Sequence, residues 1–384
     1  MSHHKLRIGI LFGGRSGEHE VSLASARSVM RALDPMRYDI VPIGITHEGQ
    51  WLTAGDPMAR LAGGARNTAE TDLGNGARRA LAPDATAARL PEVDATAVGA
   101  TVVGATAVDV IFPVLHGPYG EDGTVQGLLE LVGLPYVGCG VLASALAMDK
   151  IACKHVFLSA GLPVAAFAAI SRREWEAQRE AVLSRIEASI GYPAFVKPAN
   201  LGSSIGVGKA MDRVGLAGAL DEAAQYDRRL LVEAAVPHAR EIECSVLGND
   251  DPMASVPGEV VPSNEFYDYG AKYIDGRSQL LIPAPIPLEI AQRIREMAVQ
   301  AFRVVDGAGL ARVDFLMDGE TNRVFLNEIN TMPGFTDISM YPKLWEATGL
   351  AYPELVDRLI ELALERHADK SRSRTTFHGA MKLE

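Results

Sequence analysis

Two kinds of apolar segment alternate along the chain. Short runs rich in Val, Ile and Phe, such as 6–12 and 108–115, predict strands, and longer helix-type runs, such as 21–32 and 143–160, predict helices. Because strand-type and helix-type segments follow one another, the pattern indicates an α/β fold rather than a sandwich or a helix bundle. The first strand turns at Gly13 and Gly14 into a helix, a start that nucleotide-binding folds also show.

The pattern divides the chain into three blocks. We predict an N-terminal α/β domain over 1–138, a central domain over 139–232 and a C-terminal domain over 233–384. Within the first block, 55–107 is rich in Ala, Gly, Thr and Arg and has little periodicity. We therefore interpret 55–107 as an insertion into the first domain.

The segment 311–334 predicts a β-hairpin that carries charged side chains. Its two strands alternate in period two on either side of the turn signal Asp318-Gly319. One face of the first strand then holds Arg312, Asp314 and Leu316, and one face of the returning strand holds Leu326, Glu328 and Asn330. If a five-residue loop, 319–323, joins the strands, Asp314 lies opposite Glu328 and Arg312 lies opposite Asn330.

Facing carboxylates on a half-buried sheet indicate a cation between them. Asp314 and Glu328 repel each other unless a positive charge lies between them. Two carboxylates and the amide oxygen of Asn330 are the hard oxygen ligands that Mg²⁺ prefers. The hairpin therefore predicts a metal site, with Arg312 placed to stabilise an oxyanion. The alternative is a solvated hairpin face with one salt bridge.

A second chemical signal lies at the end of the strand 194–197. Lys197 closes an apolar strand, where an unpaired ammonium is costly to bury, so we expect an anionic partner such as phosphate. The loop 198–209, PANLGSSIGVGK, follows at once, and backbone N–H groups in such a loop can hold phosphate oxygens. It does not have the spacing of a P-loop. A glycine-rich β-hairpin with a purely structural role fits the same residues.

Two further segments offer contacts to a nucleotide. Glu233, Glu241 and Glu243 lie on strand-type segments, where they could accept hydrogen bonds from an adenine amino group or ribose hydroxyls, or simply be solvated. The loop 263–273, SNEFYDYGAKY, is unusually aromatic for a linker. We interpret 263–282 as a functional lid, the alternative being a surface loop that packs its own tyrosines.

Composition excludes several classes of partner. The formal net charge of −11 argues against nucleic acid and anionic membranes. The longest weakly polar run, 95–108, is too short to span a bilayer, and the N-terminus does not have the pattern of a signal peptide. Cys139, Cys153 and Cys244 have no CxxC spacing, which favours a reducing compartment and buried, inert thiols over a zinc site. We therefore expect a cytoplasmic protein with no nucleic-acid or membrane partner.

Several motifs together resemble those of the D-alanine:D-alanine ligases of the ATP-grasp superfamily. They are GGRSGEHEVS from Gly13, HGPYGEDGTVQG from His116, MDK from Met148, VKPANLGSSIGV from Val196, REIECSVLGN from Arg240, EFYDYGAKY from Glu265, ARVDF from Ala311 and NEINTMPGFTDIS ending at Ser339. The likeness covers nearly the whole chain except 55–107. It implies a three-domain ATP-grasp architecture with an N-terminal Rossmann-like domain, and a cytoplasmic homodimer that makes D-alanyl-D-alanine for peptidoglycan precursors.

The resemblance also implies roles for individual residues toward ATP and metal. The ATP phosphates would be bound by Lys150, Lys197 and Lys272, the adenine by Glu233 and its neighbours, and the ribose by Glu241. Two Mg²⁺ ions, for which Mn²⁺ can substitute, would be held by Asp314, Glu328 and Asn330. Glu233 and Glu241 stand one residue further apart than the family pattern, and Gly270 stands where the lid of the family has an acid.

The amino-acid substrates are assigned in the same way. Glu18 would receive the ammonium of the first D-alanine, hydrogen-bonded with Ser203 and Tyr273, and with His116 nearby. Ser339 would bind the carboxylate of the second D-alanine, while Arg312 and the N–H of Gly334 would form the oxyanion hole. The implied reaction activates one D-alanine as an acyl phosphate, which the amine of the second D-alanine then attacks.

Other functions fit parts of the sequence. A D-alanine:D-lactate ligase would use the same scaffold, although Tyr273 in the lid disfavours it. A carboxylase-type subunit is disfavoured by the motifs around Glu18 and His116. A non-catalytic ATP-grasp nucleotide sensor would lose metal ligands or the oxyanion arginine, which this chain keeps. An NAD-dependent dehydrogenase would depend on the Gly13 turn alone.

Overall fold

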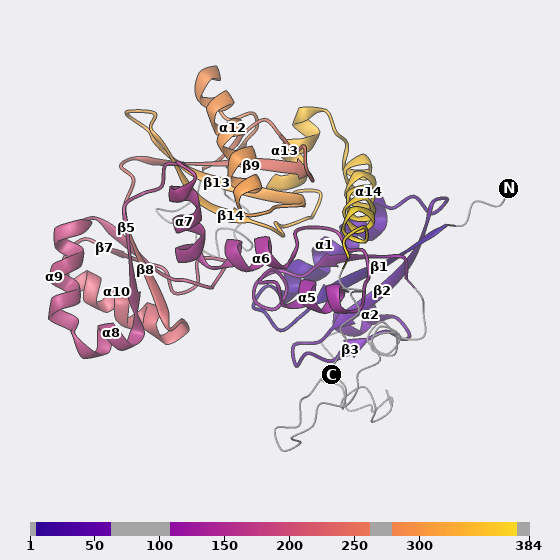
Figure 1. Ribbon diagram of the computed structural model, residues 1–384, viewed down its shortest axis with the longest axis horizontal. Coiled ribbons are helices and arrows are strands. Elements are labelled where there is room, and N and C mark those ends of the chain that lie inside the picture. Colours follow the sequence, from indigo (N-terminus) through magenta and orange to yellow (C-terminus); the bar gives the residue numbers. More distant parts are fainter. Residues whose placement is uncertain (1–4, 63–107, 262–278, 375–384) are drawn as a thin grey trace, which may run out of the picture.

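The computed structural model describes residues 5–62, 108–261 and 279–374. These ranges form three β-sheets with helices packed on them, so the predicted α/β class is confirmed (Figure 1). Most of the predicted insertion 55–107 and of the predicted lid 263–282 lies outside the described residues, including Lys272 and Tyr273. In Figure 1 the sheet formed by strands within 167–234 and the sheet formed by strands within 6–114 lie at opposite ends of the molecule. The third sheet, formed by strands within 239–330, lies between them.

The N-terminal sheet is parallel at its centre. Its strands are β1 (Leu6–Gly13), β2 (Tyr38–Ile45), β3 (Trp51–Leu52) and β4 (Val110–Val114), in the order β3-β2-β1-β4. β1 runs parallel to β2 and β4, and only β3 is antiparallel. The helices of this part are α1 (His19–Ala32), α2 (Pro57–Ala62) and α5 (Thr124–Leu131). The parallel sheet with flanking helices agrees with the predicted Rossmann-like domain.

The C-terminal helix packs against this first sheet. α14 (Tyr352–Lys370) places Leu355 and Leu359 in the same core as Ile8 and Val29, and in Figure 1 it lies beside α1 and β1. The hydrophobic core therefore crosses the predicted division at 138/139, because the chain returns to its first domain at its end.

The segment predicted as one helix over 143–160 is two helices. α6 (Val141–Met148) ends and α7 (Lys150–Ser159) begins at Asp149, whose backbone is extended and whose side chain accepts a hydrogen bond from the N–H of Ala152. An aspartate that caps a helix N-terminus interrupts the preceding helix, which the apolar pattern alone does not reveal. The break places Lys150 in the first turn of α7.

The central sheet is fully antiparallel. It contains β5 (Phe167–Ser171), β6 (Ala194–Pro198), β7 (Gly208–Ala210) and β8 (Arg229–Ala234), in the order β5-β8-β6-β7. One face packs on α8 (Arg172–Ala177), α9 (Arg179–Ser189) and α10 (Arg213–Tyr226). Phe195 pairs with Glu233, so Lys197, two residues further along β6, shares the opposite face with Glu233.

The third sheet carries the predicted hairpin. Its strands are β9 (Ala239–Gly248), β10 (Met253–Ala254), β11 (Gly258–Val261), β12 (Gln279–Leu281), β13 (Gly309–Asp318) and β14 (Val324–Asn330), in the order β12-β11-β9-β13-β14 with β10 paired to β9. α12 (Leu288–Val304) and α7 pack on one face, and α13 (Met340–Thr348) follows the hairpin. All three cysteines are free and buried, as predicted, and burial raises the pKa of Cys139 to about 11.

Candidate active site

The hairpin forms with the register that the sequence predicts at its charged residues. A five-residue loop, 319–323, joins β13 to β14, and Asp314 pairs with Glu328 while Arg312 pairs with Asn330. A β-bulge shifts the register after Asp314, so that Phe315 pairs with Leu326 and Asn327 is the extra residue. The prediction that Leu326 shares a face with Glu328 is wrong, because the bulge reverses the alternation and buries Leu326 in the core.

The acids of the hairpin are compensated by nearby cations. The Arg312 guanidinium donates two hydrogen bonds to the Asp314 carboxylate, at 2.7 and 2.6 Å, and its Nε lies 3.1 Å from Oε2 of Glu243 on β9. The Lys150 ammonium lies 3.4 Å from Glu328, whose side chain is 32% exposed. To contact a substrate, the Arg312 guanidinium must therefore give up one or both of its hydrogen bonds to Asp314. A divalent cation bound to the Asp314 carboxylate would favour this exchange.

The donor set of the hairpin fits Mg²⁺. Asp314 and Glu328 supply carboxylate oxygens, and Asn330 supplies an amide oxygen that already accepts the N–H of Met332 at 3.0 Å. An amide oxygen has a second lone pair, so this hydrogen bond leaves it able to ligate a cation. Hard oxygen ligands of this kind, two of them charged, are typical of Mg²⁺ sites in enzymes that handle phosphate.

A cleft of about 860 Å³ brings the predicted residues together. Its walls come from the N-terminal domain, the 198–209 loop and the hairpin. The predicted site residues that line it are Glu18, His116, Lys150, Ser203, Arg312, Glu328, Asn330, Gly334 and Ser339. Asp314 reaches this group through Arg312, whereas Lys197, Glu233 and Glu241 lie beyond the cleft lining.

One wall connects the N-terminal domain to the central domain. The Ser203 hydroxyl donates a hydrogen bond of 2.5 Å to the Glu18 carboxylate, which is 8% exposed. Ser203 and Ser204 have φ angles of +52° and +58°, a conformation that costs a non-glycine residue energy and is common at ligand sites. The structure thus pairs Glu18 with Ser203 as the resemblance implies, and the third member, Tyr273, lies outside the described residues.

His116 forms a neutral, fixed part of the cleft wall. Its Nδ1–H donates to the carbonyl of Met332 at 2.9 Å, and its Nε2 lies 3.2 Å from the hydroxyl of Ser25. Burial lowers the pKa of His116, so the imidazole is uncharged at neutral pH. Its Nε2 then accepts a hydrogen bond from the Ser25 hydroxyl. Because both ring nitrogens have partners, His116 orients the chain around Met332 rather than acting as an acid or base.

Glu121 is a cleft residue that sequence reasoning missed. It lies in the loop that follows His116 and accepts a hydrogen bond from the backbone N–H of Gly117. Burial, with the nearby Glu18 carboxylate as a second cause, raises the pKa of Glu121 to about 8. The available signal was the pair Glu121-Asp122 between two glycines in HGPYGEDGT, although nothing in the sequence distinguishes either acid from a turn residue.

The far end of the cleft suits a carboxylate. Ser339 is the N-cap of α13, and its hydroxyl bonds to the N–H and hydroxyl of Thr336 at 3.1 and 2.7 Å. A helix N-terminus presents free N–H groups and a partial positive charge. A Cβ on Gly334 would lie 3.2 Å from the Ser339 hydroxyl, so glycine leaves this end of the cleft open.

Behind the cleft, three charged side chains form a cluster that we call the lysine cluster: Lys154, Lys197 and Glu233. The Glu233 carboxylate accepts from Lys154 at 2.6 Å and from Lys197 at 2.8 Å. Burial would raise the pKa of Glu233, but the two ammonium groups lower it to about 2. Lys197 was predicted to have an anionic partner such as phosphate, and the structure supplies the Glu233 carboxylate. The second lysine, Lys154, was not predicted.

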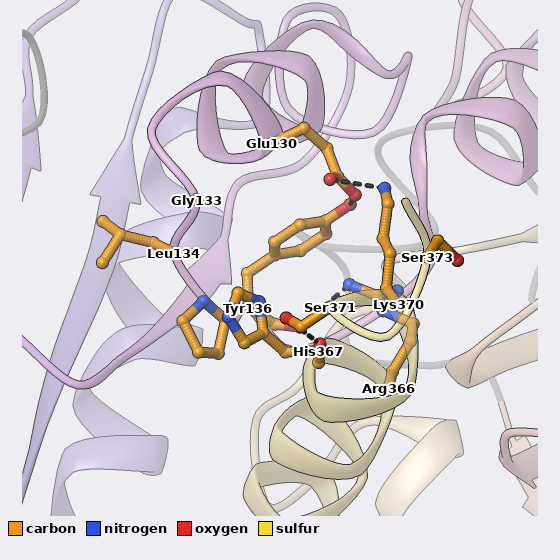
Figure 2. A pocket seen from close by; sticks show the side chains of 10 residues that line it. Glu130, Gly133, Leu134, Tyr136, Arg366, His367, Lys370, Ser371 and Ser373 are labelled. Atoms are coloured by element: carbon orange, nitrogen blue, oxygen red, sulfur yellow. Dashed lines mark hydrogen bonds and ion pairs between the residues drawn. The ribbon is translucent and has the colours of Figure 1, made fainter. Parts of the chain in front are cut away.

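Two other clusters do not form comparable sites. The rings of His19 and His47 lie near Glu20, but they stack at 3.8 Å with planes 24° apart, so their in-plane lone pairs do not converge on one metal ion. Figure 2 shows a hollow of about 330 Å³ between Tyr136 and the end of α14. There Lys370 forms an ion pair with Glu130 at 2.5 Å, and this pair connects α14 to the N-terminal domain.

The three-sheet fold and the cleft between its domains define an ATP-grasp protein. Two family models match the chain, D-ala D-ala ligase N-terminus over residues 7–139 and D-ala D-ala ligase C-terminus over 156–361. A D-alanine–D-alanine ligase from Heliobacterium modesticaldum is 51% identical over 97% of this chain and 98% of its own length. One from Geobacillus kaustophilus is 49% identical over 97% of this chain and 98% of its own length.

Solved structures agree with the family models. The D-alanine-D-alanine ligase from Coxiella burnetii has a TM-score of 0.75 and 35% identity, covering 96% of this chain and 98% of its own. A D-Ala:D-Ser ligase from Enterococcus faecalis has a TM-score of 0.77 and 34% identity, covering 94% of this chain and 100% of its own. The chain belongs to the D-alanine–D-alanine ligase family, which confirms the predicted resemblance. No helix in the described ranges is long and apolar enough to cross a membrane.

Proposed function

We propose that the cleft joins two D-alanine molecules with ATP as the energy source, by way of a D-alanyl phosphate. The use of ATP is supported by membership in a family of ATP-dependent ligases. The choice of D-alanine as substrate is supported by D-alanine–D-alanine ligases that are about half identical over nearly the full length. The single structural observation that supports the chemistry best is the hairpin register, which sets Asp314 opposite Glu328 and Arg312 opposite Asn330 beside the cleft.

Phosphoryl transfer requires two anions to approach each other. When bound, Mg²⁺ at Asp314, Glu328 and Asn330 would neutralise charge on the ATP phosphates and on the transferred phosphoryl group. Lys150 lies 3.4 Å from Glu328, so its ammonium is close to the place where the phosphates would meet the metal ligands. We assign two Mg²⁺ ions to this set, with Mn²⁺ as an effective substitute.

The amino acids occupy the two ends of the cleft in this proposal. The Glu18 carboxylate, held by Ser203, receives the ammonium of the first D-alanine. Ser339 and the N-terminus of α13 receive the carboxylate of the second D-alanine. The carbonyl that is attacked then lies between them, where Arg312 and the Gly334 N–H stabilise the tetrahedral oxyanion.

Three further parts of the proposal concern the lid residues, the nucleotide contacts on the central and third sheets, and the assembly of the enzyme. Lys272 binds ATP and Tyr273 completes the hydrogen-bond network of Glu18 and Ser203. Glu233 and Glu241 lie on the nucleotide side and contact adenine and ribose. The enzyme works as a homodimer in the cytoplasm, and light scattering at working concentration measures the dimer.

The decisive test is ADP release with defined amino acids. We expect release with D-alanine, none with L-alanine, and D-alanyl-D-alanine as the product identified by mass spectrometry. D-Lactate and D-serine, each offered together with D-alanine, test the alternative acceptors. A mixed product that exceeds D-alanyl-D-alanine at equal acceptor concentration would replace the proposed substrate, and ADP release independent of D-alanine would refute the ligase reaction.

A further inference from the structure

Lys154 carries a charge that the proposed reaction does not use. It lies on α7 and is the only lysine of the described ranges that is buried, with 2% of its surface exposed. Its ammonium donates to the Glu233 carboxylate at 2.6 Å and to the backbone carbonyl of Asn327 at 3.0 Å. An ammonium buried this deeply is costly unless its partners are fixed, so its position in the fold is tightly determined.

The charge of the lysine cluster depends on Lys154. Lys154 and Lys197 together carry two positive charges, and Glu233 between them carries one negative charge. The cluster therefore keeps a net charge of about +1, which an approaching phosphate would neutralise. Without Lys154, the Glu233 carboxylate and the Lys197 ammonium would cancel each other, and Lys197 would have less charge to offer to a nucleotide.

The second contact of Lys154 reaches the metal hairpin. Asn327 is the extra residue of the β-bulge, and an extra residue leaves backbone groups outside the regular ladder. Lys154 satisfies the Asn327 carbonyl, and the next residue along β14 is the proposed metal ligand Glu328. The Asn327 side-chain oxygen lies 3.5 Å from the Lys197 ammonium, so the bulge also borders the lysine cluster.

We propose that Lys154 is a positioning residue for ATP: it shares Glu233 with Lys197, so that Glu233 does not fully offset the positive charge that Lys197 presents to the nucleotide, and it fixes the bulge next to Glu328. This inference rests on the proposed nucleotide role of Lys197. Lys154 itself contacts no substrate. Its loss is expected to weaken nucleotide binding and to leave unchanged the proposed D-alanine sites, which are built from Glu18, Ser203 and the N-terminus of α13.

The test is the affinity for ADP with Mg²⁺, measured by titration calorimetry on the full chain. Lys154→Met is expected to raise the Kd at least about tenfold, equivalent to about 1.4 kcal/mol. The KM for D-alanine should stay within about twofold. Lys154→Gln keeps amide donors while losing the charge, so it serves if Lys154→Met does not fold, and its Kd should also rise.

Cys153→Ala is the matched control. Cys153 is the neighbouring residue on α7, is buried in the hydrophobic core and lies outside the lysine cluster. The cavity should lower the melting temperature without changing the Kd for ADP. A wild-type Kd in either folded Lys154 variant, or an equal loss of affinity in Cys153→Ala, would overturn the inference. A wild-type protein that binds ADP but does not produce ADP from ATP in the presence of D-alanine would instead refute the proposed function.

Discussion

The β13–β14 hairpin and the lysine cluster both hold opposite charges close together, but they differ in how open they are. In the hairpin, Glu328 is 32% exposed toward the cleft and lies 3.4 Å from Lys150. In the lysine cluster, the side chains of Lys154 and Glu233 are 3% and 5% exposed and 2.6 Å apart. The open set can exchange its partners for a metal ion and phosphates. The closed set keeps its partners and fixes the position of Lys197 next to the proposed nucleotide site.

The largest effect should follow from Glu328→Gln. Removing this carboxylate takes a charged ligand from the proposed Mg²⁺ site, and we expect turnover to fall by at least about 100-fold. Stability without ligands should hold or rise, since the change also relieves repulsion between facing acids. Initial rates at saturating D-alanine and increasing Mg²⁺ measure this effect. Turnover near that of the wild type at ordinary Mg²⁺ would show that Glu328 is not a metal ligand.

Asp314→Asn should separate the two acids by stability. Relief of repulsion between the facing acids by itself predicts that removing either one keeps or raises the stability of the protein without ligands, but the structure pairs Asp314 with Arg312 through two hydrogen bonds. Asn cannot accept both, so we expect a loss of about 1–3 kcal/mol in the free energy of unfolding. Urea unfolding of both variants without nucleotide measures it, and equal stability of the two would contradict this distinction.

Glu121→Gln should change the pH dependence of stability. Because the pKa of Glu121 is raised to about 8, the folded state keeps a proton that the unfolded state loses above its ordinary pKa. This group therefore costs the wild type stability progressively as pH rises from about 5 to 8. The melting temperature of Glu121→Gln relative to wild type should rise over that range and then level off. A difference that does not vary with pH would exclude a raised pKa.

The smallest effect should come from the hollow at the end of α14. Lys370 is 61% exposed on its side chain and pairs with Glu130, and an ion pair this exposed is worth about 0–1 kcal/mol. Lys370→Met should leave turnover and the KM for ATP unchanged and lower stability only slightly. A clear loss of turnover would show that this hollow communicates with the cleft.

From the sequence pattern alone, contacts between residues close together in the sequence could be predicted, and contacts between distant residues could not. The pairs Asp314–Glu328 and Arg312–Asn330 were predicted from one short loop, but Met317 rather than Asp318 lies opposite Val324 beside the loop, and the bulge restores the predicted pairs further along. The bulge at Asn327 was missed, because Leu326, Glu328 and Asn330 still alternate in period two along the sequence and nothing in that pattern marks an extra residue. Lys154 was missed because its partners, Glu233 on β8 and Asn327 on β14, come from different sheets. Only the folded arrangement shows why an ammonium is buried there.

Binding of Mn²⁺ in the presence of ADP and phosphate tests whether Asp314, Glu328 and Asn330 hold the metal, because it reports on the metal ligands without requiring turnover. Electron paramagnetic resonance of free Mn²⁺ gives the Kd for the wild type, for Glu328→Gln and for Lys370→Met as a control. We expect at least about tenfold weaker Mn²⁺ binding in Glu328→Gln and no change in Lys370→Met. Wild-type affinity in Glu328→Gln would contradict the assignment of the hairpin as the metal site of the ligase.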